Sequence, residues 1–255
     1  MKKFSSLVII VCLLAVGIYF WNHPYQISAL GLFTKYALDE VEPSKKEVRM
    51  VAVGDSLSFG VGDEGDHGYV GDTKRFYEEK CDCNTVLKNY GVPNATSHHL
   101  LKRLKEENIQ RSITQANIVF VNIGTNDFIK SSDNMTDPHS KEVNKGKEQY
   151  SNNLQHVISE IRKQNKAVPI YFIGLYDPYI EQDRKHLSSF IHEWNTLVQQ
   201  SASSDQNVHY VKTEDLFENK DKQRYFSDSL HPNERGYNLI AERIVSTIKD
   251  VRSSS

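Results

Sequence analysis

The sequence predicts an α/β protein, in which five parallel strands form the middle layer of a three-layer α/β/α sandwich. Two observations indicate this class. Short runs rich in β-branched residues alternate with longer amphipathic stretches, an order typical of strands joined by crossover helices. Several short runs, such as "NIVFVNIG" and "VPIYFIG", are almost wholly apolar, as expected for a parallel sheet that is buried on both faces.

The individual elements follow from these patterns. Strands are expected at about residues 49–53, 85–90, 117–123, 168–174 and 207–211. Apolar residues recur at helical spacing from Leu100 to Leu104, from Tyr150 to Ile161 and from Leu187 to Val198. A final helix is expected to begin near Pro232, because a proline in the first turn loses no hydrogen bond. Residues 131–146 are polar and irregular, which predicts a surface loop.

The N-terminus carries a different signal. Lys2 and Lys3 precede Phe4–Trp21, an uncharged stretch of 18 residues. This length lies within the roughly 17–25 residues that span a bilayer and exceeds the roughly 7–15 residues of a usual signal-peptide core. An uncleaved anchor is therefore expected, with the lysines on the cytoplasmic side. Cleavage near Ser28-Ala29 is the alternative.

These observations divide the chain into three parts. Residues 1–22 are predicted to be a membrane anchor or signal segment, residues 23–48 a spacer, and residues 49–250 one α/β domain. The domain is expected outside the cytoplasm of a bacterium, either anchored to the cytoplasmic membrane or secreted.

Charge and cysteine content exclude other classes. The net charge is −2, and the basic residues are scattered among acidic ones, so no basic stripe is available for nucleic acid. Cys81 and Cys83 are predicted to be free thiols, because a disulfide across a single residue is expected to be strained. Too few Cys or His residues stand at ligand spacing for a metal site, and neither a metal nor a cofactor is expected.

Polar segments follow four of the five predicted strands. They read "GDSLS", "NYGVPN", "GTND" and "DSLH", and they follow the first, second, third and fifth strands. Ligands bind outside the carboxyl ends of parallel strands, so all four segments are expected at one edge of the sheet. Together they supply a hydroxyl, a histidine, a carboxylate and a carboxamide, which suit acyl transfer through a covalent serine intermediate.

Three of these residues are candidates for the reacting groups. Ser56 needs a base to take its proton, and His231 can serve if a carboxylate fixes its tautomer. Asp228, three residues earlier, is close enough in sequence to do so. The oxyanion needs N–H donors, which the Asn126 side chain and the Ser56 backbone can provide. An alternative is that Asp228 and His231 only cap the final helix.

In their order and intervals, the four segments resemble those of the SGNH or GDSL hydrolases, a superfamily of esterases, lipases and carbohydrate deacetylases. The resemblance covers roughly residues 49–250. It implies a flavodoxin-like sheet of order 2-1-3-4-5, with Ser56 as nucleophile and Asn126 as an oxyanion donor. It also implies that Asp228 and His231 complete the catalytic triad.

The second segment departs from the family pattern. The glycine whose backbone N–H usually faces the oxyanion falls here on Asn94, while Gly91 matches an earlier glycine. Asparagine tolerates a positive φ better than most residues. Asn94 is therefore the expected third donor, and Gly91 is the alternative. Asp55 and Asp127 are interpreted as residues that organise the turns.

The sequence thus predicts a serine ester hydrolase that acts on a small-molecule, lipid or glycan ester and contacts the membrane through its N-terminal segment. Phospholipid acyl groups, acetyl groups on cell-wall glycan and thioesters are all open as substrates. The alternative is a non-catalytic, membrane-tethered binding domain that retains the fold, which Asn94 in place of glycine favours. Residues 176–179, Tyr-Asp-Pro-Tyr, either line the pocket or form an aromatic turn.

Overall fold

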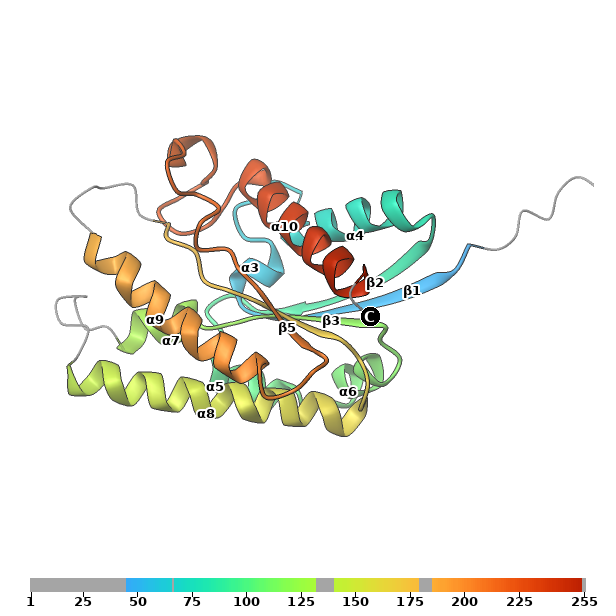
Figure 1. Cartoon of the computed structure of the whole chain (residues 1–255), viewed down its shortest axis with the longest axis horizontal. Coiled ribbons are helices and arrows are strands. Elements are labelled where there is room, and N and C mark those ends of the chain that lie inside the picture. Colours follow the sequence, from blue (N-terminus) through green and yellow to red (C-terminus); the bar gives the residue numbers. More distant parts are fainter. Residues whose placement is uncertain (1–44, 66, 132–139, 179–184, 254–255) are drawn as a thin grey trace, which may run out of the picture. The chain divides into compact units, whose positions relative to one another are not determined.

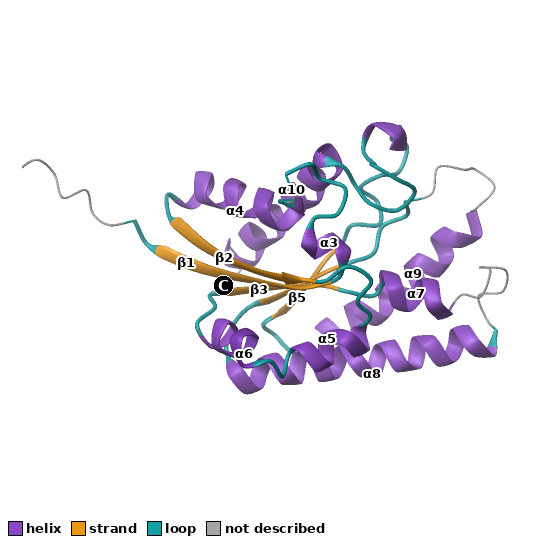
Figure 2. Ribbon diagram, turned by 180° about the vertical axis from the view of Figure 1, so that it is seen from behind, coloured by secondary structure: helices purple, strands orange, loops and turns teal. Residues whose placement is uncertain are grey.

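A single five-stranded parallel sheet forms the centre of the domain. The structure, a computed structural model, describes residues 45–65, 67–131, 140–178 and 185–253. The strands are β1 (Glu47–Gly54), β2 (Asn84–Gly91), β3 (Ile118–Asn122), β4 (Ile170–Ile173) and β5 (Val208–Val211). They lie in the order β2-β1-β3-β4-β5 and pair in parallel (Figure 2). The predicted fold and strand order are confirmed.

Helices cover both faces of the sheet (Figure 1). One face carries α3 (Ser56–Phe59), α4 (Gly68–Cys81) and α10 (Glu234–Ser253). The other carries α5 (Ser97–Arg103), α6 (Glu107–Thr114), α7 (Thr125–Ser131), α8 (Lys141–Gln164) and α9 (Lys185–Ala202). A short 3₁₀ helix, η3 (Lys222–Arg224), lies between β5 and α10. The domain is therefore the three-layer α/β/α sandwich that the sequence predicts.

The sheet separates two hydrophobic cores. Successive strand residues point to opposite faces, so Val51 and Val53 pack into the core beneath α5, α6, α8 and α9. Met50 and Ala52, from the same strand, pack into the core beneath α4 and α10. Both faces of the sheet are thus buried, which explains why these strands read as unbroken apolar runs.

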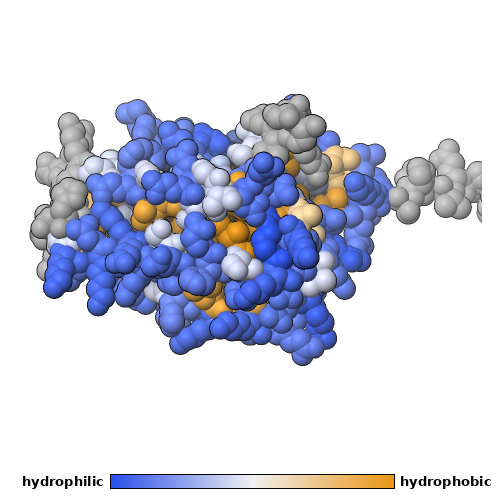
Figure 3. Space-filling model, turned by 60° about the horizontal axis from the view of Figure 1, so that its bottom comes forward, coloured by the Kyte–Doolittle hydropathy of each residue, from blue (hydrophilic) through white to orange (hydrophobic). Residues whose placement is uncertain are grey.

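Helix α8 buries apolar residues on one side and exposes polar residues on the other. Its buried residues are Val143, Tyr150, Leu154, Val157, Ile158 and Ile161. Figure 3 brings forward the lower face of Figure 1, where α8 lies, and the surface there is mostly hydrophilic with small hydrophobic patches. The helix therefore packs on the sheet by one apolar stripe.

The carboxyl ends of three neighbouring strands are tied together by backbone hydrogen bonds. The Asp55 N–H donates to the Asn122 carbonyl over 3.1 Å, and the Val92 N–H donates to the Gly54 carbonyl over 3.0 Å. A Cβ at Gly54 would collide with the Asn122 carbonyl and with the Ser58 hydroxyl. Only glycine permits this close approach, and it brings the segments after β1, β2 and β3 to one edge.

Strand β1 begins earlier than the sequence predicts. Glu47 and Val48, which were assigned to the spacer, belong to the sheet and pair with Asn84 and Thr85 of β2. Val48 is buried. Val48 is the single apolar residue in a charged run, so the alternation of polar and apolar residues did not indicate the first residues of the strand.

Two helix boundaries also differ from the predictions. Helix α8 begins at Lys141, capped by the Ser140 hydroxyl, so the last part of the predicted 131–146 loop is helical. Residues 132–139 lie outside the described residues. Helix α10 begins at Glu234 rather than near Pro232, because the Asn233 side chain caps its first turn.

The predicted anchor at residues 1–22 lies outside the described residues, as does the spacer up to residue 44. Within the part of the chain that the structure describes, no helix is both long enough and apolar enough to cross a bilayer.

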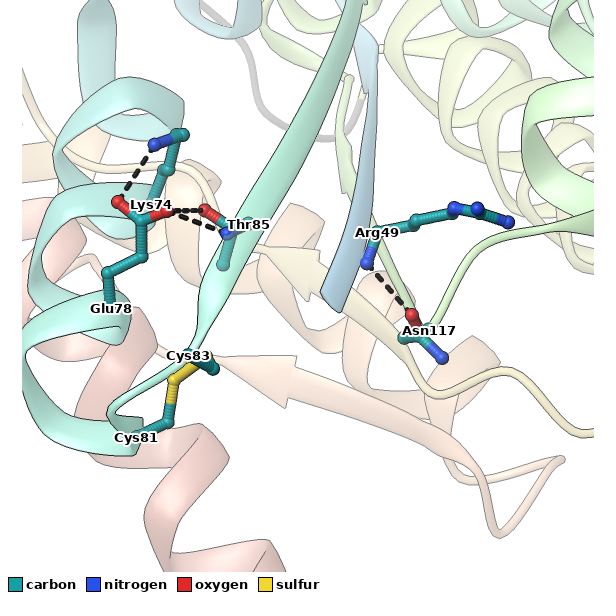
Figure 4. Close-up of a disulfide and its surroundings, with 7 residues drawn as sticks. All are labelled: Arg49, Lys74, Glu78, Cys81, Cys83, Thr85 and Asn117. Atoms are coloured by element: carbon teal, nitrogen blue, oxygen red, sulfur yellow. Dashed lines mark hydrogen bonds and ion pairs between the residues drawn. A yellow bond between two sulfur atoms is a disulfide. The ribbon is translucent and has the colours of Figure 1, made fainter. Parts of the chain in front are cut away.

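Cys81 and Cys83 form a disulfide, so the prediction of two free thiols is wrong (Figure 4). Asp82, at the end of α4, adopts the left-handed conformation with a φ of 48°. This turn places the two Cα atoms 5.3 Å apart, within the usual range of about 4.4–6.8 Å. The local turn, which sequence spacing does not reveal, makes the bond possible.

We predict that this disulfide stabilises the domain only modestly, because it closes a loop of three residues. The chain-entropy relation gives about 1–2 kcal/mol for so short a loop. The Cys81→Ser, Cys83→Ser double variant should lose about this much free energy of unfolding in urea titrations. Dithiothreitol should destabilise the parent protein equally and leave the double variant unchanged. Parent protein that is insensitive to dithiothreitol would contradict this.

Candidate active site

Ser56 lies at the turn where β1 passes into α3. Asp55 has an extended backbone and caps α3, because its Oδ1 accepts the Leu57 N–H over 3.0 Å. The helix is four residues long and ends at Gly60, which has a φ of 105°. Ser56 is its first residue and is 8% exposed. The sharp turn therefore presents the hydroxyl at the sheet edge on a short, capped helix.

His231 joins Ser56 to Asp228 in one hydrogen-bonded chain. The His231 Nε2 lies 3.0 Å from the Ser56 Oγ, and the His231 Nδ1 lies 2.8 Å from the Asp228 Oδ2. Ser56 and His231 are 175 residues apart in sequence. The structure thus brings together the three residues that the sequence singled out, in the order a serine–histidine–aspartate relay requires.

The loop that carries His231 is held by its own hydrogen bonds. The Asp228 Oδ1 accepts the backbone N–H groups of Leu230, over 2.7 Å, and His231, over 2.6 Å. Burial by itself raises the pKa of Asp228, but the hydrogen bonds from His231 and Leu230 outweigh it and hold the pKa below its usual value. Asp228 is therefore an ionised carboxylate at neutral pH.

Asp228 and His231 do not cap helix α10. The side chain of Asn233 accepts the N–H groups of Arg235 and Gly236 and so caps α10. Asp228 instead accepts hydrogen bonds within its own loop and from the His231 ring. The capping alternative for the two residues is not supported.

Candidate oxyanion donors lie on three segments at this edge. Asn126 is the second residue of α7, and its Nδ2 donates one hydrogen bond to the Ala95 carbonyl over 2.9 Å. A carboxamide has two N–H donors, so a second one is left for a ligand. The backbone N–H groups of Ser56 and Asn94 donate to no acceptor among the described residues.

Local geometry favours Asn94 over Gly91 as the third candidate donor. Asn94 has a φ of 64°, the positive value expected for a residue standing in for glycine. The Gly91 N–H donates to the Asn89 Oδ1 over 3.0 Å and is therefore already engaged. Of the two backbone groups, Asn94 is the one with a free N–H.

Asp127 organises the turn that carries Asn126. Its two carboxylate oxygens accept the backbone N–H of Ser97 over 2.8 Å and the Ser97 hydroxyl over 2.5 Å. These bonds tie α7 to α5. Burial raises the pKa of Asp127, although the hydrogen bonds from Ser97 oppose the rise. Among the described residues, no group of three or more His, Cys, Asp or Glu could hold a metal ion.

Asp55 is the second turn-organising carboxyl and is fully buried. Burial raises its pKa to about 7, against the lowering effect of the Leu57 N–H, and the charge of Asp127 raises it further. Its Oδ2 has no hydrogen-bond partner among the described residues. This carboxyl therefore changes charge near neutral pH directly beside Ser56.

Two residues support the His231 loop through contacts that the sequence did not indicate. The Tyr176 hydroxyl, after β4, donates to the Leu230 carbonyl over 2.9 Å. Gly62 has a φ of 98°, and a Cβ there would collide with the Pro232 carbonyl. The only sequence signals were the position of Tyr176 after a strand and the glycines that follow Ser56.

We predict that the ionisation of Asp55 makes the domain less stable as the pH rises. In the unfolded chain this carboxyl loses its proton near its ordinary pKa of 3.8, whereas the folded protein keeps it until about pH 7. The folded state binds more protons in this window, so its stability falls with increasing pH.

Asp55→Asn keeps the acceptor for Leu57 and removes the charge. From pH 5 to pH 8, the free energy of unfolding of the parent should fall by about 3 kcal/mol relative to this variant. Urea titrations at several pH values measure the difference. A constant difference across this range would exclude the raised pKa.

Comparisons with known proteins identify the family and the fold of the chain. Residues 52–239 match the model of the GDSL-like lipase/acylhydrolase family. The chain is 32% identical over 212 residues to the uncharacterized protein YpmR of Bacillus subtilis (strain 168), covering 81% of this chain and 83% of that protein. It is 24% identical over 206 residues to the spore germination lipase LipC of Bacillus licheniformis, covering 77% and 94%.

Solved structures show the same fold. The lipase Lip_vut3 from a goat rumen metagenome superposes with a TM-score of 0.70 at 22% identity, covering 78% of this chain and 97% of that one. The acetylxylan esterase Axe2 from Geobacillus stearothermophilus gives a TM-score of 0.64 at 18% identity, covering 80% and 95%. The expected class of enzyme, a carboxylic ester hydrolase, is confirmed by the family match. The chain belongs to the GDSL-like lipase/acylhydrolase family.

Proposed function

We propose that this protein hydrolyses carboxylic esters through a covalent acyl-serine intermediate. Ser56 is the nucleophile, His231 is the general base and acid, and Asp228 orients His231. The observation that carries this proposal is the continuous chain from the Ser56 Oγ through both ring nitrogens of His231 to the Asp228 Oδ2, with distances of 3.0 and 2.8 Å.

The reaction follows from these positions. The Ser56 Oγ attacks the ester carbonyl carbon while the His231 Nε2 takes the hydroxyl proton. Asp228, held ionised by its hydrogen bonds, stabilises the imidazolium that forms. The tetrahedral intermediate then expels the alkoxide, which receives the proton from His231. Water attacks the acyl-serine with the same proton transfers and releases the carboxylic acid.

The negative oxygen of the tetrahedral intermediate requires fixed donors. The proposal assigns this role to the Asn126 side chain and to the backbone N–H groups of Ser56 and Asn94. The free N–H groups of Ser56 and Asn94 support it, as does the second N–H of Asn126. Such preorganised donors stabilise charge that develops only in the transition state.

The location proposed for the enzyme is outside the cytoplasm, where it is either tethered to the cytoplasmic membrane by residues 1–22 or secreted. The uncharged stretch Phe4–Trp21 after two lysines supports export. The Cys81–Cys83 disulfide supports it independently, because disulfides persist in oxidising compartments. LipC is described as a lipase and Axe2 as an acetylxylan esterase, so lipid and glycan esters are both candidate substrates here.

The rival function, a non-catalytic tethered binding domain, was favoured by Asn94 in place of glycine. Asn94 adopts the positive φ that a glycine would supply. This observation removes the support for the rival, which predicts neither turnover nor labelling of Ser56.

We predict that Ser56→Ala folds normally but loses at least about 10⁴-fold in kcat toward p-nitrophenyl acetate. It should also resist labelling by a fluorophosphonate, because only the activated hydroxyl reacts. Ser58→Ala is the matched control: the Ser58 hydroxyl is buried two residues away and is hydrogen-bonded to Tyr69. The control should keep both labelling and turnover. Full activity of Ser56→Ala would refute the proposal.

We predict that Asn126→Ala lowers kcat by about 100- to 1000-fold with little change in KM, because the lost donor acts mainly in the transition state. Steady-state kinetics on the same ester measure both constants. Asn117→Ala, whose side chain accepts the Arg49 N–H away from the site (Figure 4), is the control and should keep its kcat. Equal kcat values in the two variants would remove Asn126 from the mechanism.

A further inference from the structure

A small apolar slot adjoins the candidate site. Its walls include Thr125 and Phe128 of α7, Leu175 and Tyr176 after β4, Ile191 of α9, and Leu230 before α10. None of the described residues that line it carries a charge. Four separate segments of the chain therefore meet around one uncharged space.

Two of the chain segments that form the candidate site also line the slot. Thr125 directly precedes Asn126, and Leu230 directly precedes His231. Two walls of the slot are thus chain neighbours of an oxyanion donor and of the catalytic base. The slot therefore lies at the sheet edge that carries the candidate site.

The chemistry of the walls favours a hydrocarbon occupant. The Tyr176 hydroxyl is already committed to the Leu230 carbonyl, and most of the other walls are apolar. A hydroxylated alcohol group placed there would lose its hydrogen bonds to water without adequate replacement, which is costly. The apolar end of an acyl group has no such cost.

The size of the slot limits this occupant. Its volume is about 20 Å³, whereas one water molecule needs roughly 10–15 Å³ of such space. A methyl group, or at most an ethyl group, fits this volume. An octanoyl chain does not.

The walls are fixed and do not give way readily. Leu175 is clamped by Asn195, which accepts its N–H over 2.7 Å and donates to its carbonyl over 2.9 Å. Phe128 packs edge-on against Trp194, with 5.8 Å between the ring centroids. Tyr176 holds Leu230 by the hydrogen bond described above. Close packing of this kind resists an increase in volume.

We propose that this slot receives the acyl group of the substrate and restricts the enzyme to esters of short acids, acetyl above all. The inference rests on the proposed hydrolase function and names its substrate class.

The first test compares p-nitrophenyl acetate, butyrate and octanoate on the full-length protein, each below its solubility limit. The value of kcat/KM should fall at least about tenfold from acetate to octanoate, since one excess methylene in a fitted pocket already costs about tenfold or more. A second series of acetate esters with different alcohols should vary less. An octanoate value equal to or above the acetate value would overturn the proposal.

The second test enlarges the slot. Ile191→Ala should raise the ratio of octanoate to acetate kcat/KM by about tenfold. Leu230→Ala, at a partly exposed wall, should do the same and provides the answer if Ile191→Ala fails to fold. Ile161→Ala, a similar truncation in the same hydrophobic core but away from the slot, is the control and should keep the parent ratio.

The results distinguish a wrong assignment of the slot from a failure of the proposed hydrolase function. If both slot variants keep the parent acyl preference and change the preference for the alcohol instead, the slot binds the leaving group and the inference is wrong. If the parent hydrolyses no ester and resists the fluorophosphonate, the proposed function itself fails, and the acyl assignment fails with it.

Discussion

The close approach of strands β1 and β3 at Gly54 is the constraint on which the site depends. The backbone bonds from Asp55 to Asn122 and from Val92 to Gly54 draw the ends of three strands into register. Parallel strands all end at the same edge, so this register places the segments after β1, β2 and β3 side by side. The serine and the candidate oxyanion donors are therefore positioned by the sheet itself.

The histidine is positioned in a different way. His231 lies in a loop rather than at a strand end, and the loop is kept in shape by short-range bonds. The Ser227 N–H and hydroxyl donate to the His231 carbonyl over 2.9 and 3.0 Å, and Asp228 accepts two N–H groups. From outside the loop, the Tyr176 hydroxyl joins it to the segment after β4, and Ser56 bonds to the His231 ring. The alignment of His231 with Ser56 therefore depends on hydrogen bonds within this loop and on its link to the segment after β4.

The sequence was sufficient to predict the parts of the protein that depend on residue type and short spacing. The apolar runs predicted the strands, and the four polar segments predicted which side chains meet, including Ser56 and His231. Their catalytic roles remain predictions. What could not be predicted depends on tertiary contacts or on single backbone angles. The Tyr176–Leu230 bond joins residues 54 apart in sequence, and the Cys81–Cys83 disulfide depends on the left-handed Asp82. Neither leaves a periodic signal.

Buried polar groups without partners lie directly behind the serine. The Asp55 Oδ2 and the Asn122 Oδ1 both lack a hydrogen-bond partner among the described residues, and the two residues are joined by a backbone bond. Buried polar atoms are nearly always satisfied in folded proteins, because leaving one unpaired costs about 1–3 kcal/mol. The Asp55 Oδ2 lies at the turn that presents Ser56 and the Asn122 Oδ1 at the end of β3, so both atoms belong to the sheet edge that carries the candidate site. Unpaired polar atoms are expected at functional sites, where the position of a side chain is set by chemistry rather than by packing. The turn at Asp55 holds the Ser56 hydroxyl 3.0 Å from the His231 ring, so the polar atoms of this edge serve the geometry of the candidate site more than the packing of the core.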